Sequence, residues 1–284
     1  MPCADDPDGF YAELTARNRG LIEPELQARL RRTRFVVAGC GSTGGAVLMP
    51  LLRTGAERMV LLDPGSYELN NLNRQDATLA DLGRNKATVC AERLLAVNPC
   101  AVVEAHTAGV KADTILSVLD AGDIAMDAID VTSDAGIDAK LAFHDAAARL
   151  RLTVVTAYDI ATTQFIEVFD YKKVKRPLGG RVKPGAGPEQ VLRSLIPPLA
   201  LPREIFPVLA ERRRDPSGGF PQLVMTSTLL GAMAVEIILR LLAGKPIRRR
   251  ITVDLADLVR PALRRSAGRL RRDVGLVDLW RKMR

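Results

Sequence analysis

A glycine-rich segment is the first pattern in the sequence that can support chemistry. Residues 39–44 read GCGSTG and match G-x-G-x-x-G, with glycines at Gly39, Gly41 and Gly44. Between a strand and a helix, such a segment can bind a phosphate because its N–H groups and the helix dipole both favour an anion. Asp63 ends the next apolar run, where a carboxylate can hydrogen-bond a ribose hydroxyl. These residues predict nucleotide binding.

Taken alone, the glycines and Asp63 favour a dinucleotide-dependent oxidoreductase, or a glycine turn that only packs a helix on a strand. A run of polar residues changes this interpretation, because an NAD site does not require it. Residues 70–75 read NNLNRQ, Lys86 begins the next expected helix, and Asp130 follows the fourth expected strand. With these residues the sequence resembles the ThiF/MoeB/HesA family, prokaryotic relatives of ubiquitin-activating enzymes that adenylate a carboxylate with ATP. The resemblance runs from about residue 19 to 170 and returns at 223–244.

The resemblance implies roles for individual residues. Those implied for ATP binding are Gly39, Gly41, Ser42, Gly44, Asp63, Asn71, Arg74, Gln75 and Lys86. Asp63 would bind the ribose, Arg74 would contact the phosphates, and Lys86 would neutralise the triphosphate. Asp130 would hold Mg²⁺ near the α-phosphate. Arg19 would cross a twofold interface to the partner's nucleotide, so the resemblance also implies a homodimer whose catalytic residues are Arg19, Arg74, Lys86 and Asp130.

Adenylation explains why these residue types are needed. When a carboxylate attacks the α-phosphorus of ATP, two anions approach each other and pyrophosphate leaves, so catalysis consists mainly of alignment and charge neutralisation. Arginine and lysine bind phosphate oxygens, and Mg²⁺ is coordinated by carboxylate oxygens. No base is required, because the attacking carboxylate is already ionised at neutral pH.

Simpler roles remain open at each position. Arg74 and Lys86 could be solvated charges, Asp130 could cap the following helix, and Asp127 could hold the magnesium instead. The sequence also departs from the family pattern, with Gly65 where many relatives carry a second acidic residue and Gly20 where many carry glutamine.

The cysteines set this chain apart from many family members. Cys3, Cys40, Cys90 and Cys100 include no C-x-x-C pair, so we expect neither a zinc site nor a disulfide framework. No cysteine follows Cys100, so residues 171–221 cannot supply a thiol nucleophile. We therefore expect an enzyme that forms an acyl-adenylate and passes it directly to an acceptor, without an enzyme thioester. Its substrate would be the C-terminus of a ubiquitin-like or carrier protein or of a peptide, or a small acid.

Other functions are compatible with the same residues. The family includes a tRNA-modifying dehydratase of the threonylcarbamoyladenosine type, whose magnesium-binding stretch is similar to DAID at residues 127–130. A nucleic-acid partner is not favoured, because the chain shows no RNA-binding module and no aromatic platform. A non-catalytic, peptide-binding member of the family and an NAD-dependent oxidoreductase are the remaining alternatives.

The elements that position these residues alternate. Short apolar runs at 34–39, 58–63, 101–106, 124–128, 152–157, 164–170 and 251–254 are expected strands, and helices are expected at 43–54, 85–97, 111–121, 139–150 and 223–244. This order predicts a Rossmann-like, doubly wound α/β fold with a mostly parallel sheet and an N-terminal helical arm. Residues 1–254 are expected to form the adenylation domain, with 171–221 as a proline-rich excursion on the substrate side whose walls include Tyr158, Asp159 and Tyr171.

The composition limits the alternatives further. The chain has 284 residues, 47% of them hydrophobic, with a formal net charge of +8. Lys245 to Arg284 hold 13 basic and four acidic residues, so the basic character lies in the tail at 255–284 and just before it. The first residues are acidic and the longest apolar run, 223–242, contains Glu236 and Arg240. We therefore expect a cytoplasmic protein without a membrane-spanning segment.

Overall fold

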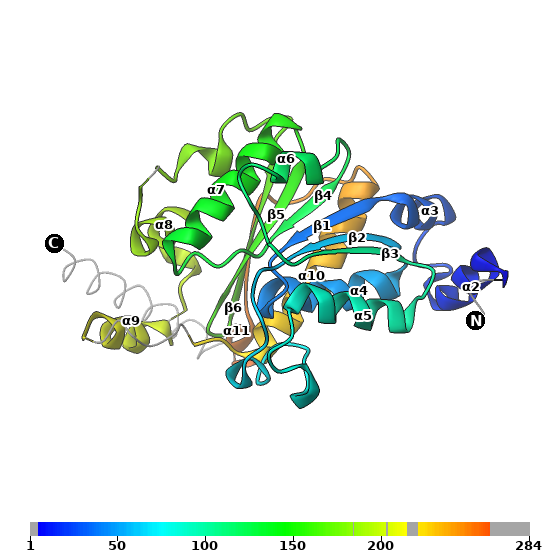
Figure 1. Ribbon diagram of the computed structural model, residues 1–284. Coiled ribbons are helices and arrows are strands. Elements are labelled where there is room, and N and C mark those ends of the chain that lie inside the picture. Colours follow the sequence, from blue (N-terminus) through cyan, green and yellow to red (C-terminus); the bar gives the residue numbers. More distant parts are fainter. Residues whose placement is uncertain (1–4, 184, 203, 215–220, 262–284) are drawn as a thin grey trace.

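One seven-stranded sheet organises the computed structural model, which describes residues 5–183, 185–202, 204–214 and 221–261. The strand order is β3-β2-β1-β4-β5-β6-β7 (Figure 1). The strands are β1 (Arg34–Ala38), β2 (Arg58–Leu62), β3 (Val102–His106), β4 (Ile124–Asp127), β5 (Thr153–Ile160), β6 (Thr163–Asp170) and β7 (Arg250–Asp254). The first five strands are mutually parallel, and β6 and β7 add antiparallel pairs. The predicted Rossmann-like, mostly parallel sheet is confirmed.

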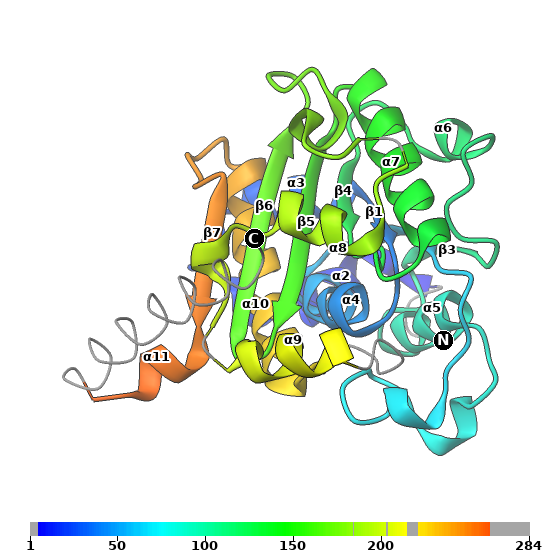
Figure 2. The ribbon, with the colours of Figure 1, turned by 90° about the vertical axis from the view of Figure 1, so that its left-hand side faces the viewer.

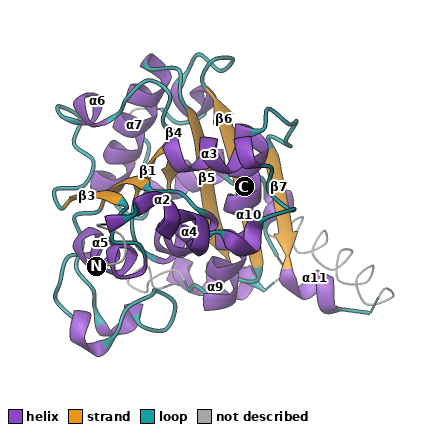
Figure 3. Cartoon of the chain, turned by 90° about the vertical axis from the view of Figure 1, so that its right-hand side faces the viewer, coloured by secondary structure: helices purple, strands orange, loops and turns teal. Residues whose placement is uncertain are grey.

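Helices cover both faces of this sheet. They are α2 (Pro7–Leu14), α3 (Pro24–Arg32), α4 (Ser42–Thr54), α5 (Lys86–Val97), α6 (Ile115–Val118), α7 (Asp134–Arg149), α8 (Pro188–Leu195), α9 (Ile205–Arg214), α10 (Val224–Leu242) and α11 (Leu255–Val259). One apolar core packs α4, α5 and α10 on the sheet, and a second packs α6, α7 and α8 on the opposite face. Figure 3 views the side of α4 and α10, and Figure 2 shows α8 and α9 in front of β5 and β6.

Close contact between α4 and α10 depends on a small residue. A Cβ added to Gly231 would lie 2.5 Å from the carbonyl oxygen of Ala46, so only glycine permits this helix spacing. By length and composition α10 could cross a membrane, yet one of its faces lies in the apolar core against α4 and the sheet. Its apolar character thus has a packing role within the chain, and the absence of a membrane segment stays a prediction.

The hairpin of β5 and β6 extends beyond the carboxyl edge of the parallel sheet. The last pair of β4 with β5 is Asp127 with Thr156, whereas β5 continues to Ile160 and pairs with β6 from Thr163 onward. Only two residues connect the strands, and so short a connection must reverse the chain direction. The two strands expected from the sequence are confirmed, and their overhang places residues 157–166 beside the carboxyl end of β4.

One sequence expectation needs correction. The helix expected at 111–121 is reduced to the four residues of α6, because residues 112–114 form turns instead. Cys40 and Cys90 are free and Cys100 is disulfide-bonded, so the cysteines do not form the framework of several disulfides that the sequence argues against. The division of the chain at residue 254 stays a prediction; β7 ends there and α11 follows directly.

Candidate nucleotide-binding site

Two glycines of the loop between β1 and α4 are required by packing within the chain, and a third is not. Gly39 has φ +93°, and a Cβ there would lie 2.4 Å from the carbonyl oxygen of Ala128. A Cβ on Gly44 would lie 1.8 Å from the carbonyl oxygen of Gly39. A Cβ on Gly41 would make only ordinary van der Waals contact with the Gln75 side chain, 3.6 Å from its amide nitrogen. The chain itself therefore leaves room for a methyl group at Gly41.

This difference predicts different results for two alanine substitutions. Gly44→Ala forces a methyl group onto backbone and should lower the free energy of unfolding by about 1–3 kcal/mol. Gly41→Ala should leave that free energy nearly unchanged, because its methyl group would make only ordinary contacts, and should weaken ATP binding, because a side chain at this position hinders the approach of a phosphate to the loop. Urea denaturation and ATP titration of both variants measure these effects; equal destabilisation by the two would contradict the prediction.

Asp63, at the end of β2, holds the loop in place. One carboxylate oxygen accepts a hydrogen bond from the backbone N–H of Cys40 at 2.6 Å, and the other accepts from that of Gly65 at 2.7 Å. The Cys40 side chain is fully buried, and its hydrogen bond with Cys90 together with burial raises the pKa of its thiol. Cys40 therefore packs beneath the loop and is not poised to react.

Two cations flank the loop without a carboxylate partner among the described residues. Lys86 is the first residue of α5, and its ammonium lies 5.8 Å from the centre of the Tyr67 ring. Arg74 donates to the side chain of Gln222 at 2.6 Å and to the carbonyl oxygen of Asn70 at 2.7 Å. These bonds orient the guanidinium and leave it without a carboxylate within ion-pair distance among the described residues, which suits an anionic ligand.

The neighbouring predicted residues support the loop in different ways. The Asn71 amide oxygen accepts from the backbone N–H of Glu68 at 3.1 Å, so Asn71 is buried and stabilises its own turn. The Gln75 amide oxygen is buried beside Gly41 and has no hydrogen-bond partner. An unpaired buried acceptor at this place indicates a missing donor group.

Asp130 and Asp127 lie at the end of β4 in very different environments. Asp130 is exposed, and its carboxylate accepts from the backbone N–H of Thr132 at 3.0 Å and from its hydroxyl at 2.7 Å. Asp127 is fully buried and forms an ion pair with Lys140 at 2.6 Å. Asp127 is thus committed to an interior ion pair, whereas Asp130 is accessible, and the role of Asp130 as the magnesium ligand stays a prediction.

A chain of hydrogen bonds connects Asp127 to the start of residues 171–221. The N–H of Leu178 donates to the Tyr171 hydroxyl at 3.0 Å, which lies 2.6 Å from Nδ1 of His144, whose Nε2 lies 2.8 Å from Asp127. Burial lowers the pKa of His144 and so favours its neutral form, in which Nε2–H donates to the Asp127 carboxylate and Nδ1 accepts from the Tyr171 hydroxyl. Tyr171 is therefore an anchor in the interior and not a wall of an acid pocket.

Asp159, on the overhanging end of β5, contacts the first turn of α4. One of its oxygens lies 3.3 Å from the Ser42 hydroxyl, 3.4 Å from that of Thr43 and 3.0 Å from that of Ser227 on α10. The hydroxyls of Ser42 and Ser227 are 2.5 Å apart. Ser42 is therefore tied to α10 and β5, a connection between distant segments that the sequence motif does not reveal.

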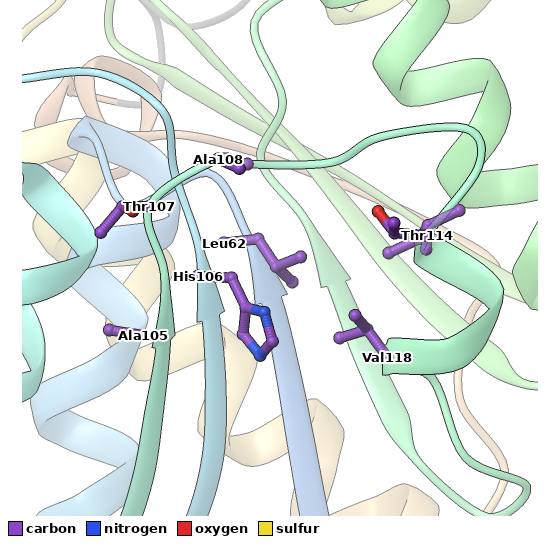
Figure 4. Close-up of a pocket in the computed structure, with 9 residues that line it drawn as sticks. Leu62, Ala105, His106, Thr107, Ala108, Thr114 and Val118 are labelled. Atoms are coloured by element: carbon purple, nitrogen blue, oxygen red, sulfur yellow. The ribbon is translucent and has the colours of Figure 1, made fainter.

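A cavity of about 390 Å³ opens beside the ends of β2 and β3. Figure 4 shows His106 and Leu62 on neighbouring strands, with Thr114 and Val118 across from them. Leu62 lines the cavity and directly precedes Asp63 in the sequence, so the cavity lies at the same edge of the sheet as the glycine loop.

Arg19 does not join this site within one chain. The neighbouring Asn18 donates to the carbonyl oxygen of Thr54, at the end of α4 opposite the glycine loop. A helix of 13 residues is about 20 Å long, so Arg19 lies roughly that far from the loop of its own chain. Its side chain is exposed and donates to the carbonyl oxygen of Ala12.

The other predicted residues surround the gap between β1 and β4. In a doubly wound sheet this is the point where the strand order reverses, and ligands bind outside the carboxyl ends of the strands there. The glycine loop follows β1, Asp63 follows β2, and Asp130 follows β4. The sequence predicts Asp159 as a wall of the acid pocket but does not predict its contact with the first turn of α4, and it predicts no role for Lys140.

Comparison with known proteins is consistent with this geometry. Residues 15–267 match the model of the ThiF family. Over 110 residues the chain is 37% identical to a sulfur carrier protein adenylyltransferase of Thermus thermophilus, covering 38% of this chain and 41% of the relative. It is 27% identical over 100 residues to tRNA threonylcarbamoyladenosine dehydratase 1 of Saccharomyces cerevisiae, covering 35% and 23%. The matches thus span less than half the length of these curated relatives.

Solved structures share the fold. The E. coli protein MccB, determined with AMPCPP and MccA, aligns with a TM-score of 0.60 at 16% identity, covering 81% of this chain and 63% of MccB. The E. coli tRNA N6-threonylcarbamoyladenosine dehydratase TcdA aligns with a TM-score of 0.58 at 21% identity, covering 82% and 95%. The ThiF family model matches most of this chain, and the glycine loop lies where the strand order of the sheet reverses. This chain therefore belongs to the ThiF family.

Proposed function

We propose that this protein uses ATP and Mg²⁺ to activate a carboxylate as an acyl-adenylate and transfers the acyl group directly to an acceptor. The observation that carries the proposal is a pair of cations, Arg74 and Lys86, that have no carboxylate within ion-pair distance among the described residues and lie beside the glycine loop. Curated relatives include adenylyltransferases, among them the sulfur carrier protein enzyme. ATP fits the donor set, since the cavity at the ends of β2 and β3 can take a base and the loop can take phosphates.

In the proposed reaction a carboxylate oxygen bonds to the α-phosphorus and the bond to the pyrophosphate oxygen breaks. Arg74 and Lys86 neutralise the charge of the phosphates, and the glycine loop fixes their position. Mg²⁺ commonly uses one or two carboxylates together with substrate phosphates, so the accessible Asp130 suffices as its protein ligand. A bound Mg²⁺ would supply further positive charge at the phosphates.

The second step needs no thiol on the enzyme. An amine or hydroxyl acceptor attacks the acyl carbon, AMP leaves, and the acceptor loses a proton. The sequence has no cysteine after Cys100, and Cys40 and Cys90 are buried. Carrier proteins and peptides are proposed substrates because relatives include a sulfur carrier protein enzyme and MccB with MccA. A homodimer is proposed because Arg19 can serve only another chain's site.

Exchange of labelled pyrophosphate into ATP tests the proposal. The expected result is exchange that depends on Mg²⁺ and on an added acid from a panel of small acids, peptides and glycine-ended carrier proteins. ATP binding without exchange for any of these acids would contradict the proposed activity. The second candidate, a tRNA dehydratase, is supported by the likeness to TcdA and would instead consume ATP only with threonylcarbamoyl-modified tRNA.

A further inference from the structure

The short segment that carries Asp130 is held closely by its surroundings. The N–H of Ala128 donates to the carbonyl oxygen of Ala38, the last residue of β1, at 2.8 Å. A Cβ added to Gly136 would lie 1.9 Å from the carbonyl oxygen of Asp130, so the first turn of α7 packs directly on the Asp130 backbone. Asp130 is exposed, yet the backbone that carries its side chain is fixed on two sides.

A buried ion pair contacts the residue that precedes Asp130. Oδ1 of Asp127 accepts a hydrogen bond from the N–H of Ile129 at 3.2 Å, and Nζ of Lys140 lies 3.5 Å from the carbonyl oxygen of Ile129. The side chains of Asp127 and Lys140 are 0% and 1% exposed, and their charged atoms are 2.6 Å apart. Both polar backbone groups of Ile129 therefore face one ion pair, and a shift of that pair would move the peptide bond that leads into Asp130.

Three donors fix the orientation of the Asp127 carboxylate. Its Oδ2 lies 2.6 Å from Nζ of Lys140, 2.8 Å from Nε2 of His144 and 3.0 Å from the hydroxyl of Thr156. Lys140 and His144 belong to α7, whereas Thr156 belongs to β5, so the carboxylate is bound from two elements. The carboxylate cannot rotate without breaking these bonds, and Oδ1 is thereby kept on the N–H of Ile129.

The other end of this network lies in residues 171–178. Nδ1 of His144 accepts from the Tyr171 hydroxyl at 2.6 Å, and that hydroxyl accepts from the N–H of Leu178 at 3.0 Å. Tyr171 and Leu178 are both buried in the core on the α7 side of the sheet. A continuous set of hydrogen bonds thus extends from residues 171–178 to the peptide bond before Asp130.

Stability alone does not explain a buried network of this kind. Apolar residues of similar volume often pack as stably as a buried ion pair, because removing two charges from water is costly. Apolar residues cannot provide the directed hydrogen bonds that hold one peptide group in a narrow range of positions. The peptide group held here leads to the carboxylate expected to bind Mg²⁺, and contacts that orient a metal ligand strongly affect metal affinity.

We propose that a buried network of positioning residues places Asp130 to bind Mg²⁺ beside the nucleotide phosphates. This network, named the Asp127 network, consists of Asp127, Lys140, His144, Thr156 and Tyr171. All five side chains are buried and act through the backbone before Asp130, without touching the nucleotide or the metal. The inference rests on the proposed function and deepens it, because it names the interior residues that set the affinity for Mg²⁺.

Binding of AMPCPP, a non-cleavable ATP analogue, tests this without turnover. Calorimetry in EDTA and in excess Mg²⁺ gives two dissociation constants, and their ratio is the Mg²⁺ enhancement. Thr156→Val keeps the shape of the side chain and removes one of the three donors to Oδ2, so the variant should fold. Its affinity in EDTA should equal that of wild type, and its Mg²⁺ enhancement should fall about 3- to 10-fold.

Thr153→Val is the matched control. It makes the same substitution on the same strand, and the Thr153 side chain forms no hydrogen bond among the described residues. This variant should keep the wild-type Mg²⁺ enhancement in full. Asp130→Ala provides the opposite reference and should abolish the enhancement, because it removes the proposed metal ligand itself.

Tyr171→Phe tests the far end of the network. Phenylalanine keeps the ring stacked on Phe169, with 6.0 Å between the ring centres, and removes only the hydroxyl between His144 and Leu178. The Mg²⁺ enhancement should fall about 2- to 5-fold, less than for Thr156→Val, because the lost bond is further from Asp130. This variant provides the test by itself if Thr156→Val does not fold.

The outcomes separate the inference from the proposed function. An unchanged Mg²⁺ enhancement in Thr156→Val and Tyr171→Phe would overturn the positioning role and leave the network with a purely structural one. Equal losses of affinity in EDTA and in Mg²⁺ would also overturn it, because they would indicate a general distortion of the nucleotide site. An enhancement that survives in Asp130→Ala would overturn the inference while leaving ATP binding intact. Failure of the wild-type protein to bind AMPCPP would contradict the proposed function itself.

Discussion

Replacement of Lys86 by methionine should lower pyrophosphate exchange by at least about 100-fold, the typical effect of removing one preorganised charge from a transition state. Methionine keeps most of the aliphatic length and removes the ammonium. Because no described carboxylate is paired with Lys86, its loss should change the free energy of unfolding by less than about 0.5 kcal/mol. Exchange assays and urea denaturation measure the two quantities on the same preparation.

Lys172→Met is the control for the loss of a positive charge. Lys172 is exposed after β6, far from the glycine loop along the sheet, and its removal should leave both exchange and stability unchanged. If Lys86→Met keeps full exchange, the ammonium does not contact the phosphates. If Lys86→Met instead unfolds the protein, the residue has a structural role that its contacts do not show.

The largest effect on stability is expected for Lys140→Met. This change leaves the Asp127 carboxylate buried without its cation, and breaking such a pair costs about 3–5 kcal/mol. Burial alone would raise the pKa of Asp127, but Lys140 and His144 hold it well below its ordinary range. Asp127 therefore stabilises the wild-type protein above pH about 3.9, and this contribution is lost as the pH falls through its lowered folded-state pKa.

The sign of the pH dependence reverses in the variant. Without Lys140 the folded-state pKa of Asp127 rises, so the carboxylate destabilises the fold as the pH increases through that raised value. The stability difference between wild type and Lys140→Met should be largest at pH 7 and smaller at pH 4, as measured by urea denaturation. Asp127→Asn combined with Lys140→Met should recover part of the loss. An equal deficit at both pH values would show that lost packing, not charge, is responsible.

Local patterns were enough to predict the sheet and the loop. The strand before Gly39 and the glycines that follow it are neighbours in the sequence. Both depend on backbone sterics and burial that involve only a few adjacent residues. The positions of Asp63 and Asp130 followed from the same logic, because the carboxyl ends of parallel strands share one edge.

Contacts between distant segments could not be predicted in the same way. Asp159 meets Ser42 across 117 residues, and this contact depends on how far the hairpin projects beyond β4. That length is set by strand pairing and not by composition. In the sequence, Lys140 is indistinguishable from a solvated lysine on a helix. Its side chain reaches Asp127 only because of the way α7 packs beside β4.

The beginning of α10 contacts both the polar run after β2 and the first turn of α4. Gln222, just before the helix, accepts a hydrogen bond from Arg74, and Ser227 in its first turns contacts Asp159 and Ser42. A shift of this helix end would therefore move Arg74 and Asp159 together. With ATP bound as proposed, the position of α10 and the affinity for ATP would be coupled, and by thermodynamic reciprocity each would affect the other by the same factor.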